Sequence, residues 1–253
     1  VQRAAVVLRE FSARTTVLQG NFRDLRELLA GIGVDRIDGI VFDLGVSTPQ
    51  LKDPARGFGF SQEGILDMRM DRTQGVSAKD MLASVSEREL TDILYRFGQE
   101  RWAKRIARHI VRSRQQRPIQ RTTELAGLVM EAIPRRYYPS KIHPATRTFQ
   151  ALRIAVNDEL TSIERGLDAA LDLVRPGGRI CAISFHSLED GIVKNRFRDW
   201  EKGCRCPSTI PVCVCGGKPR LRVITRRPVV PSARERDDNP SARSARLRVG
   251  ERV

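Results

Sequence analysis

Two largely apolar runs of residues constrain the fold of this chain more than any other feature. The runs cover residues 37–44 (IDGIVFDL) and 180–185 (ICAISF), and each has the length of one buried strand. Because apolar and polar residues do not alternate in them, they suit a parallel sheet that is covered on both faces. An amphipathic stretch over 148–174 precedes the second run, so the order of elements predicts an α/β fold.

Residues 77–134, between the two runs, carry helix signals. Ser86 and Glu89 have the spacing of a capping box, and apolar residues recur every fourth position over 102–110. These signals predict a small all-helical insertion within the α/β domain. The expected division is 1–75 for the first part of the α/β domain, 76–140 for the insertion and 141–253 for the second part.

Shorter segments complete this prediction. Residues 53–75 are rich in glycine yet also contain Phe and Met, so we expect an ordered functional loop rather than a linker. Residues 15–19 are β-branched and short, and they predict a strand. Residues 221–225 and 245–249 each suit an edge or terminal strand, and we expect these two strands to pair with each other.

The formal net charge of +15 favours a polyanionic partner. Residues 101–121 contain eight Lys or Arg and no acid. Four of these cations fall on the side of the predicted helix opposite its apolar residues, and we expect no acidic side chain near them. We expect all four to contact nucleic-acid phosphates: Lys104, Arg105, Arg108 and Arg112. The alternative is a solvated helix face.

The remaining composition limits the location and the redox chemistry. No run approaches the roughly 18 apolar residues that span a bilayer, and the N-terminal residues show no secretory signal, so we expect a cytoplasmic protein without a membrane partner. Cys181 reads as a small core residue. The other four cysteines form two Cys-x-Cys pairs that could hold Zn²⁺, although the usual pairs are spaced more widely. A reduced cysteine-rich loop stays open as the alternative, and no metal ligand is assigned: Cys204, Cys206, Cys213 and Cys215.

Polar residues lie at the ends of both apolar runs. Asp43 is followed by Leu44 and Gly45 at the end of the first run, and Ser184 and His186 lie at the end of the second. Ligands of open parallel sheets bind beyond the carboxyl ends of the strands, so these side chains are candidates for a site there. For Asp43, a turn or helix-cap role is as well supported as a ligand-binding role. A lone histidine at a strand end is more often structural than catalytic.

Several motifs occur together and in order, at residues 43–51, 56–60, 66–71, 143–154, 184–190 and 239–245. As a set they resemble the RsmH/MraW family of ribosomal RNA small-subunit methyltransferases over essentially the whole chain. The resemblance implies a class I, Rossmann-like methyltransferase sheet with an inserted helical domain for RNA recognition. It further implies methyl transfer from S-adenosyl-L-methionine to N4 of a cytidine in the decoding region of 16S rRNA.

The resemblance also implies roles for particular residues. Phe22, Asp43 and Gln50 match the positions that hold the cofactor. Ser184, His186 and Asp43 are candidates for the polar wall that orients the target amine, and Arg147 joins the RNA-binding candidates. The implied partner is 16S rRNA or the small ribosomal subunit, with a homodimer as a further expectation.

One departure from the family pattern affects the expected activity. The family opens with a strand and a Gly-Gly-His loop, then a second strand that ends in an acid, and neither lies within these residues. We therefore expect the first two strands to be missing and the 253 residues alone to be inactive. Two alternatives stay open, namely a non-catalytic RNA-binding remnant and another Rossmann-like enzyme such as a nicotinamide-dependent dehydrogenase, although the chain has no Gly-x-Gly-x-x-Gly.

Overall fold

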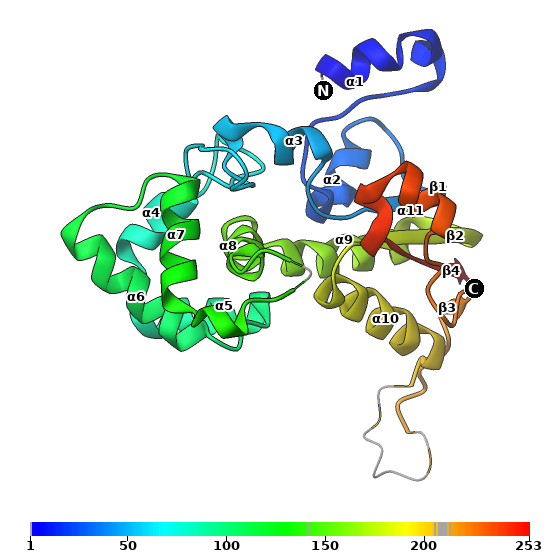
Figure 1. The fold of residues 1–253 in the computed structure, drawn as a ribbon. Helices are drawn as coiled ribbons and strands as arrows, with labels where there is room; N and C mark the ends of the chain where they lie inside the picture. Colours follow the sequence, from blue (N-terminus) through cyan, green and yellow to red (C-terminus); the bar gives the residue numbers. More distant parts are fainter. Residues whose placement is uncertain (1, 141, 205, 207–211, 213) are drawn as a thin grey trace. The chain divides into compact units, whose positions relative to one another are not determined.

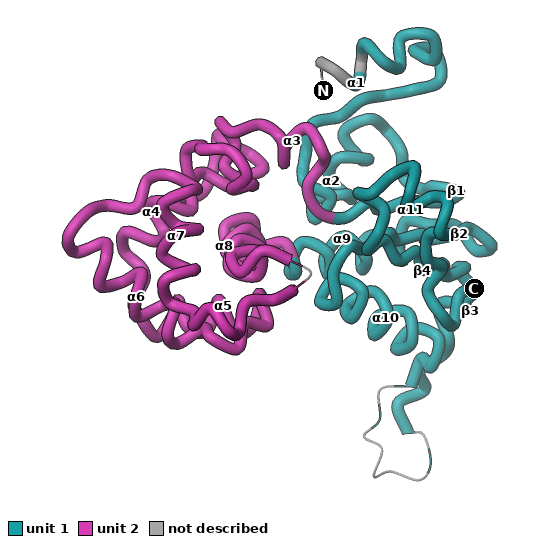
Figure 2. Tube along the Cα trace, in the orientation of Figure 1, with its two compact units in different colours: residues 1–44, 160–253 teal, residues 45–159 magenta. Residues whose placement is uncertain are grey.

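A computed structural model describes residues 2–140, 142–204, 206, 212 and 214–253 (Figure 1). The chain forms two compact units (Figure 2). Residues 1–44 and 160–253 form the first, here called the sheet unit, and residues 45–159 form the second, here called the helical unit. The combination of a sheet with many helices confirms the predicted α/β class.

The sheet unit contains a four-stranded mixed sheet in the order β1-β2-β4-β3. β1 (Ile37–Asp43) runs parallel to β2 (Val174–Ser184), as predicted for the two apolar runs. β4 (Arg246–Arg252) pairs antiparallel with β2 on one side and with β3 (Leu221–Val223) on the other. The predicted pairing of the two C-terminal segments is therefore confirmed.

Two long helices supply most of the apolar contacts to this sheet. α9 (Glu159–Leu173) contributes residues spaced by four, three and one positions, and α10 (Ser187–Lys202) contributes residues spaced by four and three. Short helices complete the unit: α1 (Gln2–Val7), α2 (Leu25–Ala30) and α11 (Ala233–Asp238). The buried side chains from α9 and α10 are Ile163, Leu167, Ala170, Leu171, Val193, Phe197 and Trp200.

β1 differs from the prediction of a strand covered on both faces. Phe42 is 6% exposed, whereas Val41 is 65% exposed. Among the described strands, β1 lies at the sheet edge with β2 as its neighbour. Only one face of β1 is thus covered by this part of the chain, and the expectation of two covered faces is wrong for it.

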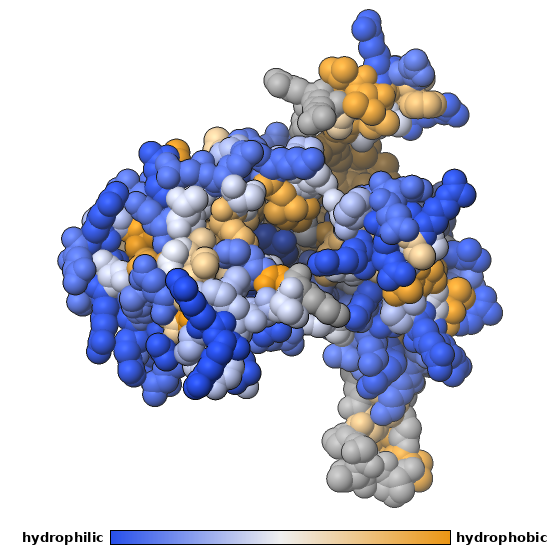
Figure 3. Space-filling view, viewed as in Figure 1, coloured by the Kyte–Doolittle hydropathy of each residue, from blue (hydrophilic) through white to orange (hydrophobic). Residues whose placement is uncertain are grey.

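The N-terminal segment also departs from its prediction. Residues 15–19 are not in a strand, because they have no ladder partner in the described chain, so the strand predicted there is wrong. Apolar side chains of this segment, among them Val6, Val7 and Phe11, are largely exposed. On the face shown in Figure 3, hydrophobic colour gathers on this segment while most of the surface is hydrophilic.

The helical unit is built around one core that five helices share with the loop before them. The helices are α4 (Ala78–Ser84), α5 (Glu87–Gly98), α6 (Ala103–Gln116), α7 (Thr122–Ala132) and α8 (Thr146–Asn157). The predicted capping box at Ser86 and Glu89 is confirmed. A further short helix, α3 (Thr48–Lys52), opens the unit. None of the helices in the described part of the chain is both long and apolar enough to cross a bilayer.

The amphipathic stretch over 148–174 forms two helices rather than one. Asp158 adopts a left-handed conformation with φ of 47° and separates α8 from α9 within this stretch. The side-chain amide of Asn157 donates to the Met68 carbonyl at 2.8 Å, and its oxygen accepts from the Met70 N–H at 2.6 Å. The end of α8 is therefore tied to the loop over 53–75 by two hydrogen bonds.

Candidate active site at the end of β2

The turn between β2 and α10 is a capped helix start. His186 adopts extended backbone angles as the N-cap residue, and its Nδ1 accepts a long hydrogen bond of 3.4 Å from the Glu189 N–H. With Nδ1 as acceptor, the ring proton lies on Nε2, which is 3.0 Å from Glu189 Oε1. His186 is thus held in one orientation by the first turn of α10.

Glu189 is the fully buried residue that shapes this turn. Its Oε2 accepts from the Phe185 N–H at 2.7 Å and from the His186 N–H at 3.2 Å. Sequence reasoning did not single out this residue. The signal was present, because a polar residue followed by Glu three positions later has the spacing of a capping box.

Ser184 does not face the cavity that His186 borders. It is buried, lies opposite Arg246 in the β2–β4 ladder, and its hydroxyl donates to the Arg246 carbonyl at 3.4 Å. In this arrangement Ser184 joins two strands. Of the three residues predicted to orient the amine, only His186 borders this cavity.

A buried ion pair anchors the C-terminal strand next to this turn. Asp190 Oδ1 accepts from Arg248 Nε at 2.6 Å and its Oδ2 from Arg248 Nη2 at 3.1 Å, while Arg246 Nη1 lies 3.3 Å from Oδ2. Burial raises the pKa of Asp190, but the hydrogen bonds and charges of Arg248 and Arg246 outweigh burial and hold the pKa below its usual range. Asp190 therefore stays ionised beside two arginines.

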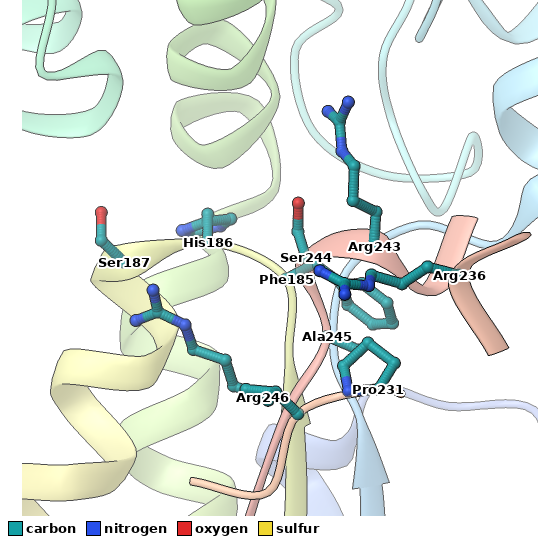
Figure 4. Close-up of a pocket in the computed structure, with 10 residues that line it drawn as sticks. Phe185, His186, Ser187, Pro231, Arg236, Arg243, Ser244, Ala245 and Arg246 are labelled. Carbon is teal, nitrogen blue, oxygen red and sulfur yellow. The ribbon is translucent and has the colours of Figure 1, made fainter. Parts of the chain in front are cut away.

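A cavity of about 420 Å³ lies between the β2–α10 turn and the segment over 230–246 (Figure 4). In Figure 4 the guanidinium of Arg246 points toward Ser187 and His186, and that of Arg236 toward Phe185 and Ser244, while Arg243 extends away from them. Within the described residues, neither Arg236 nor Arg243 has an ion-pair partner. The cavity is basic, and residues far apart in sequence form it, so periodicity could not predict it.

Two of the predicted cofactor residues lie in the sheet unit. The Phe22 ring packs edge-on against Phe42, with centroids 5.7 Å apart, and lies so close to Gly166 that a Cβ there would be 2.7 Å from its ring. Asp43 is exposed at the carboxyl end of β1. A half-buried aromatic ring and an exposed carboxylate near one strand end fit a ligand that joins a flat base to polar groups.

Gln50 belongs to the helical unit and already has a structural contact. Its Oε1 accepts from the Ser47 N–H and from the Ser47 hydroxyl, both at 2.9 Å, and so caps α3. Its amide NH₂ group is the part that could donate to a ligand. The structure therefore brings Phe22 close to the strand that ends in Asp43 and places Gln50 in the other unit.

The predicted RNA-binding cations lie on the helical unit. Lys104, Arg105 and Arg112 are exposed on α6, as expected. Arg108 Nε lies 3.4 Å from Glu87 Oε1, so the expectation that no acid lies nearby is wrong for this residue. Arg147 is exposed, and its Nη1 donates to the Gln99 carbonyl at 3.3 Å.

The fold and this site define an α/β protein whose strand-end site opens onto a basic cavity. The sequence model of the MraW methylase family matches residues 1–253. The chain belongs to the MraW methylase family.

Relatives agree with this assignment. A protein of Pelobacter propionicus named ribosomal RNA small subunit methyltransferase H is 52% identical over 253 residues, which are 100% of this chain and 81% of that protein. A protein of the same name from Trichlorobacter lovleyi is 54% identical over 246 residues, covering 97% and 79% of the two chains. That of Geobacter sulfurreducens is 52% identical over 243 residues, covering 96% and 78%.

Proposed function

We propose that this chain is an S-adenosyl-L-methionine-dependent methyltransferase that methylates N4 of a cytidine in the decoding region of 16S rRNA. The basic cavity beside His186 carries the proposal, since it offers a place for a nucleotide next to the strand ends where α/β proteins bind ligands. Family membership supports methyl transfer, and the names of the relatives support a ribosomal RNA substrate. The proposed partner is the RNA or the small subunit in the cytoplasm, and homodimer formation stays a prediction.

The cofactor would supply a methyl group on a positively charged sulfur. Phe22 would lie against its adenine, Asp43 would accept hydrogen bonds from its polar groups, and the Gln50 amide would donate to it. Of these residues, Asp43 is the one with an exposed carboxylate. A negative group near a cationic ligand also gives electrostatic stabilisation in the site.

The chain's part in the reaction is to orient the amine. The N4 lone pair is conjugated with the cytosine ring, so acceptors that bind the amine protons help to turn the lone pair toward the methyl group. Asp43 and His186 are the proposed acceptors. Because the ring proton of His186 lies on Nε2, that proton would first have to leave Nε2 before this nitrogen could accept. Ser184 would have to leave the Arg246 carbonyl to take part. The base must be unpaired or flipped to reach these groups.

We propose that the two units divide the RNA contacts. Arg236 and Arg246 would hold a phosphate beside the target nucleotide. Phosphates farther along the RNA would be contacted by the cations of the helical unit, namely Lys104, Arg105, Arg108, Arg112 and Arg147. The helical unit, residues 45–159, is wider than the insertion predicted at 76–140. RNA recognition by this unit stays a prediction.

We also propose that the class I sheet contains strands beyond β1. The open edge of β1 among the described strands supports this proposal, because an edge strand presents unpaired backbone groups. Part of the cofactor pocket would then come from those strands. The 253 residues alone are accordingly expected not to bind the cofactor or transfer methyl groups.

Calorimetry with S-adenosylhomocysteine tests the cofactor site in the protein that carries this chain. Loss of a hydrogen-bonded carboxylate costs about 1.5–3 kcal/mol, so Asp43→Ala should weaken binding roughly tenfold to a hundredfold. Asp38→Ala, at an exposed acid of the same strand, is the matched control and should bind as the wild type does. Unchanged affinity in Asp43→Ala would reject this residue as a ligand, and binding of NAD instead would favour the dehydrogenase alternative.

A further inference from the structure

Three cysteine sulfurs converge at the end of α10, in a part of the sheet unit that the proposed function does not use. The Sγ atoms of Cys204, Cys206 and Cys215 all lie within 4.8 Å of one another, and those of Cys204 and Cys215 are 3.8 Å apart. Cys204 and Cys215 are eleven positions apart in the sequence, so the fold of the chain, and not their place in the sequence, brings their sulfurs together.

The spacing matches a shared metal ion better than a disulfide. Zn²⁺ binds thiolates at about 2.3 Å in tetrahedral geometry, which places two sulfurs of one ion about 3.8 Å apart. A disulfide would require a separation of about 2.05 Å. The distance between Cys204 and Cys215 is therefore that of two ligands on one tetrahedral ion.

The backbone below the cluster is built to bring these residues together. A Cβ added to Gly217 would lie 2.2 Å from the Gly203 carbonyl oxygen, and one added to Gly203 would lie 2.3 Å from the Lys218 carbonyl carbon. The chain that leaves α10 and the chain that returns toward β3 are therefore in contact at Gly203 and Gly217, where no side chain stands between them. The Arg220 N–H also donates to the Trp200 carbonyl at 2.9 Å, which ties the return of the chain to α10 (Figure 1).

A backbone donor supports negative charge on one sulfur. The Cys206 N–H donates to Cys204 Sγ at 3.4 Å. Such a bond favours the thiolate, which is the form that binds metals, because a donated hydrogen bond stabilises the charged sulfur. The contact between the two glycines and this hydrogen bond both lie beside the converging sulfurs, so the backbone supports a metal site there.

We propose that Cys204, Cys206 and Cys215 bind a structural Zn²⁺ ion. The ion would hold together the two ends of the segment between α10 and β3. Binding releases the thiol protons to solvent, because the thiolates are the ligands. A tetrahedral ion has one more position, and the fourth cysteine of the sequence pattern, Cys213, lies outside the described residues. The proposal does not depend on methyl transfer.

Metal analysis of the protein purified without chelator tests the site. We expect about one zinc per chain in the wild type and near-zero zinc in Cys204→Ser, Cys206→Ser and Cys215→Ser. Cys181→Ser, which changes a cysteine in β2, is the matched control and should keep the metal. Replacement of zinc by Co²⁺ should give the intense thiolate-to-cobalt absorption in the wild type and in the Cys181→Ser control.

Thiol titration keeps the test decisive even where a variant folds poorly. The wild-type cysteines of the cluster should react slowly with a thiol reagent and become reactive after chelation. The proposal is overturned if the wild type holds no zinc after reconstitution and its cluster thiols react before chelation. A disulfide between any two of the three cysteines in protein kept under reducing conditions would also overturn it.

Discussion

The helical unit and the sheet unit complete their cores by different means. In the helical unit, fully buried residues such as Leu90, Leu94, Ile106 and Leu125 come from successive helices, and each helix satisfies its backbone hydrogen bonds internally. In the sheet unit, β1 needs a neighbour on each side, and Val41 is left exposed. A helical unit can therefore be complete within one stretch of chain, whereas a sheet depends on every one of its strands.

Each unit also contains one tryptophan, which makes this comparison measurable. Trp102 lies in the helical unit and Trp200 packs in the core of the sheet unit. Trp200→Phe and Trp102→Phe variants would each leave one fluorophore. Denaturation followed through that fluorophore then reports the unfolding of one unit.

The largest expected effect is on the buried ion pair of the sheet unit. The side chains of Arg248 and Asp190 are 8% and 9% exposed, and removal of one partner of such a pair costs about 3–5 kcal/mol. Arg248→Met should therefore strongly destabilise the unit that Trp200 reports. Arg69→Met, in the more exposed Asp67 pair of the helical unit, is the control and should cost less. Equal losses would contradict the difference in burial.

Core truncation should separate the two units next. Leu94 is fully buried on α5, so Leu94→Ala should cost about 2–5 kcal/mol, with the loss reported through Trp102. The measurement is chemical denaturation of the Trp200→Phe background. A cost below about 1 kcal/mol would mean that the core of the helical unit is loosely packed.

Val41→Ala tests whether chain beyond the described strands covers this face of β1. In the 253-residue chain the substitution should change stability by no more than about 0.5 kcal/mol, because the side chain is exposed. If further chain packs on this face of the sheet in the protein that carries these residues, the loss of two buried carbons at about 0.8 kcal/mol each should raise the cost above about 1 kcal/mol. Equal small effects in both proteins would contradict such a cover.

Charge reversal on α6 should change the salt dependence of RNA binding. Each lost phosphate contact lowers the slope of log affinity against log salt by about 0.7–0.9, so Lys104→Glu with Arg112→Glu should lower it by about 1.4–1.8. Arg165→Glu, at an exposed cation of the sheet unit, is the control. A slope that α6 reversal leaves unchanged would mean that this face is only solvated.

The smallest expected effect is the acid dependence of the sheet unit. The pKa of Asp190 is lower in the folded chain than its usual value near 3.8, so its ionised form stabilises the fold. That contribution is fully present above the unfolded pKa and is lost as pH falls through the folded pKa. Stability of the unit should drop below about pH 4, and Arg248→Met should remove most of this particular drop. A pH profile identical in wild type and variant would contradict the role of Asp190.

The sequence predicted the features that have a local signal. The capping box at Ser86 and the apolar face of α6 follow from local spacing, and two short apolar segments indicated the strands β3 and β4 that pair with each other. The break at Asp158 was missed because the amphipathic pattern continues across it, while the tie from Asn157 to Met68 spans 89 positions.

The candidate site shows the same division. Asp43 and His186 could be found because each follows an apolar run. The contact between Arg108 and Glu87 joins two helices, and the cavity brings Arg236 next to Phe185, so neither has a signature in periodicity. Ser184 was expected at the site, but its place in the β2–β4 ladder could not be predicted without the register.

Methyl transfer to small-subunit RNA tests the central proposal most directly. The protein that carries this chain would be incubated with labelled S-adenosyl-L-methionine and small ribosomal subunits, and the modified nucleoside would be identified and mapped by mass spectrometry. We predict N4-methylcytidine at one position in the decoding region, with the yield reduced in Asp43→Ala and kept in Asp38→Ala. Methylation of another base or of another cytosine atom, or no methylation by a protein that binds the cofactor and the RNA, would contradict the account.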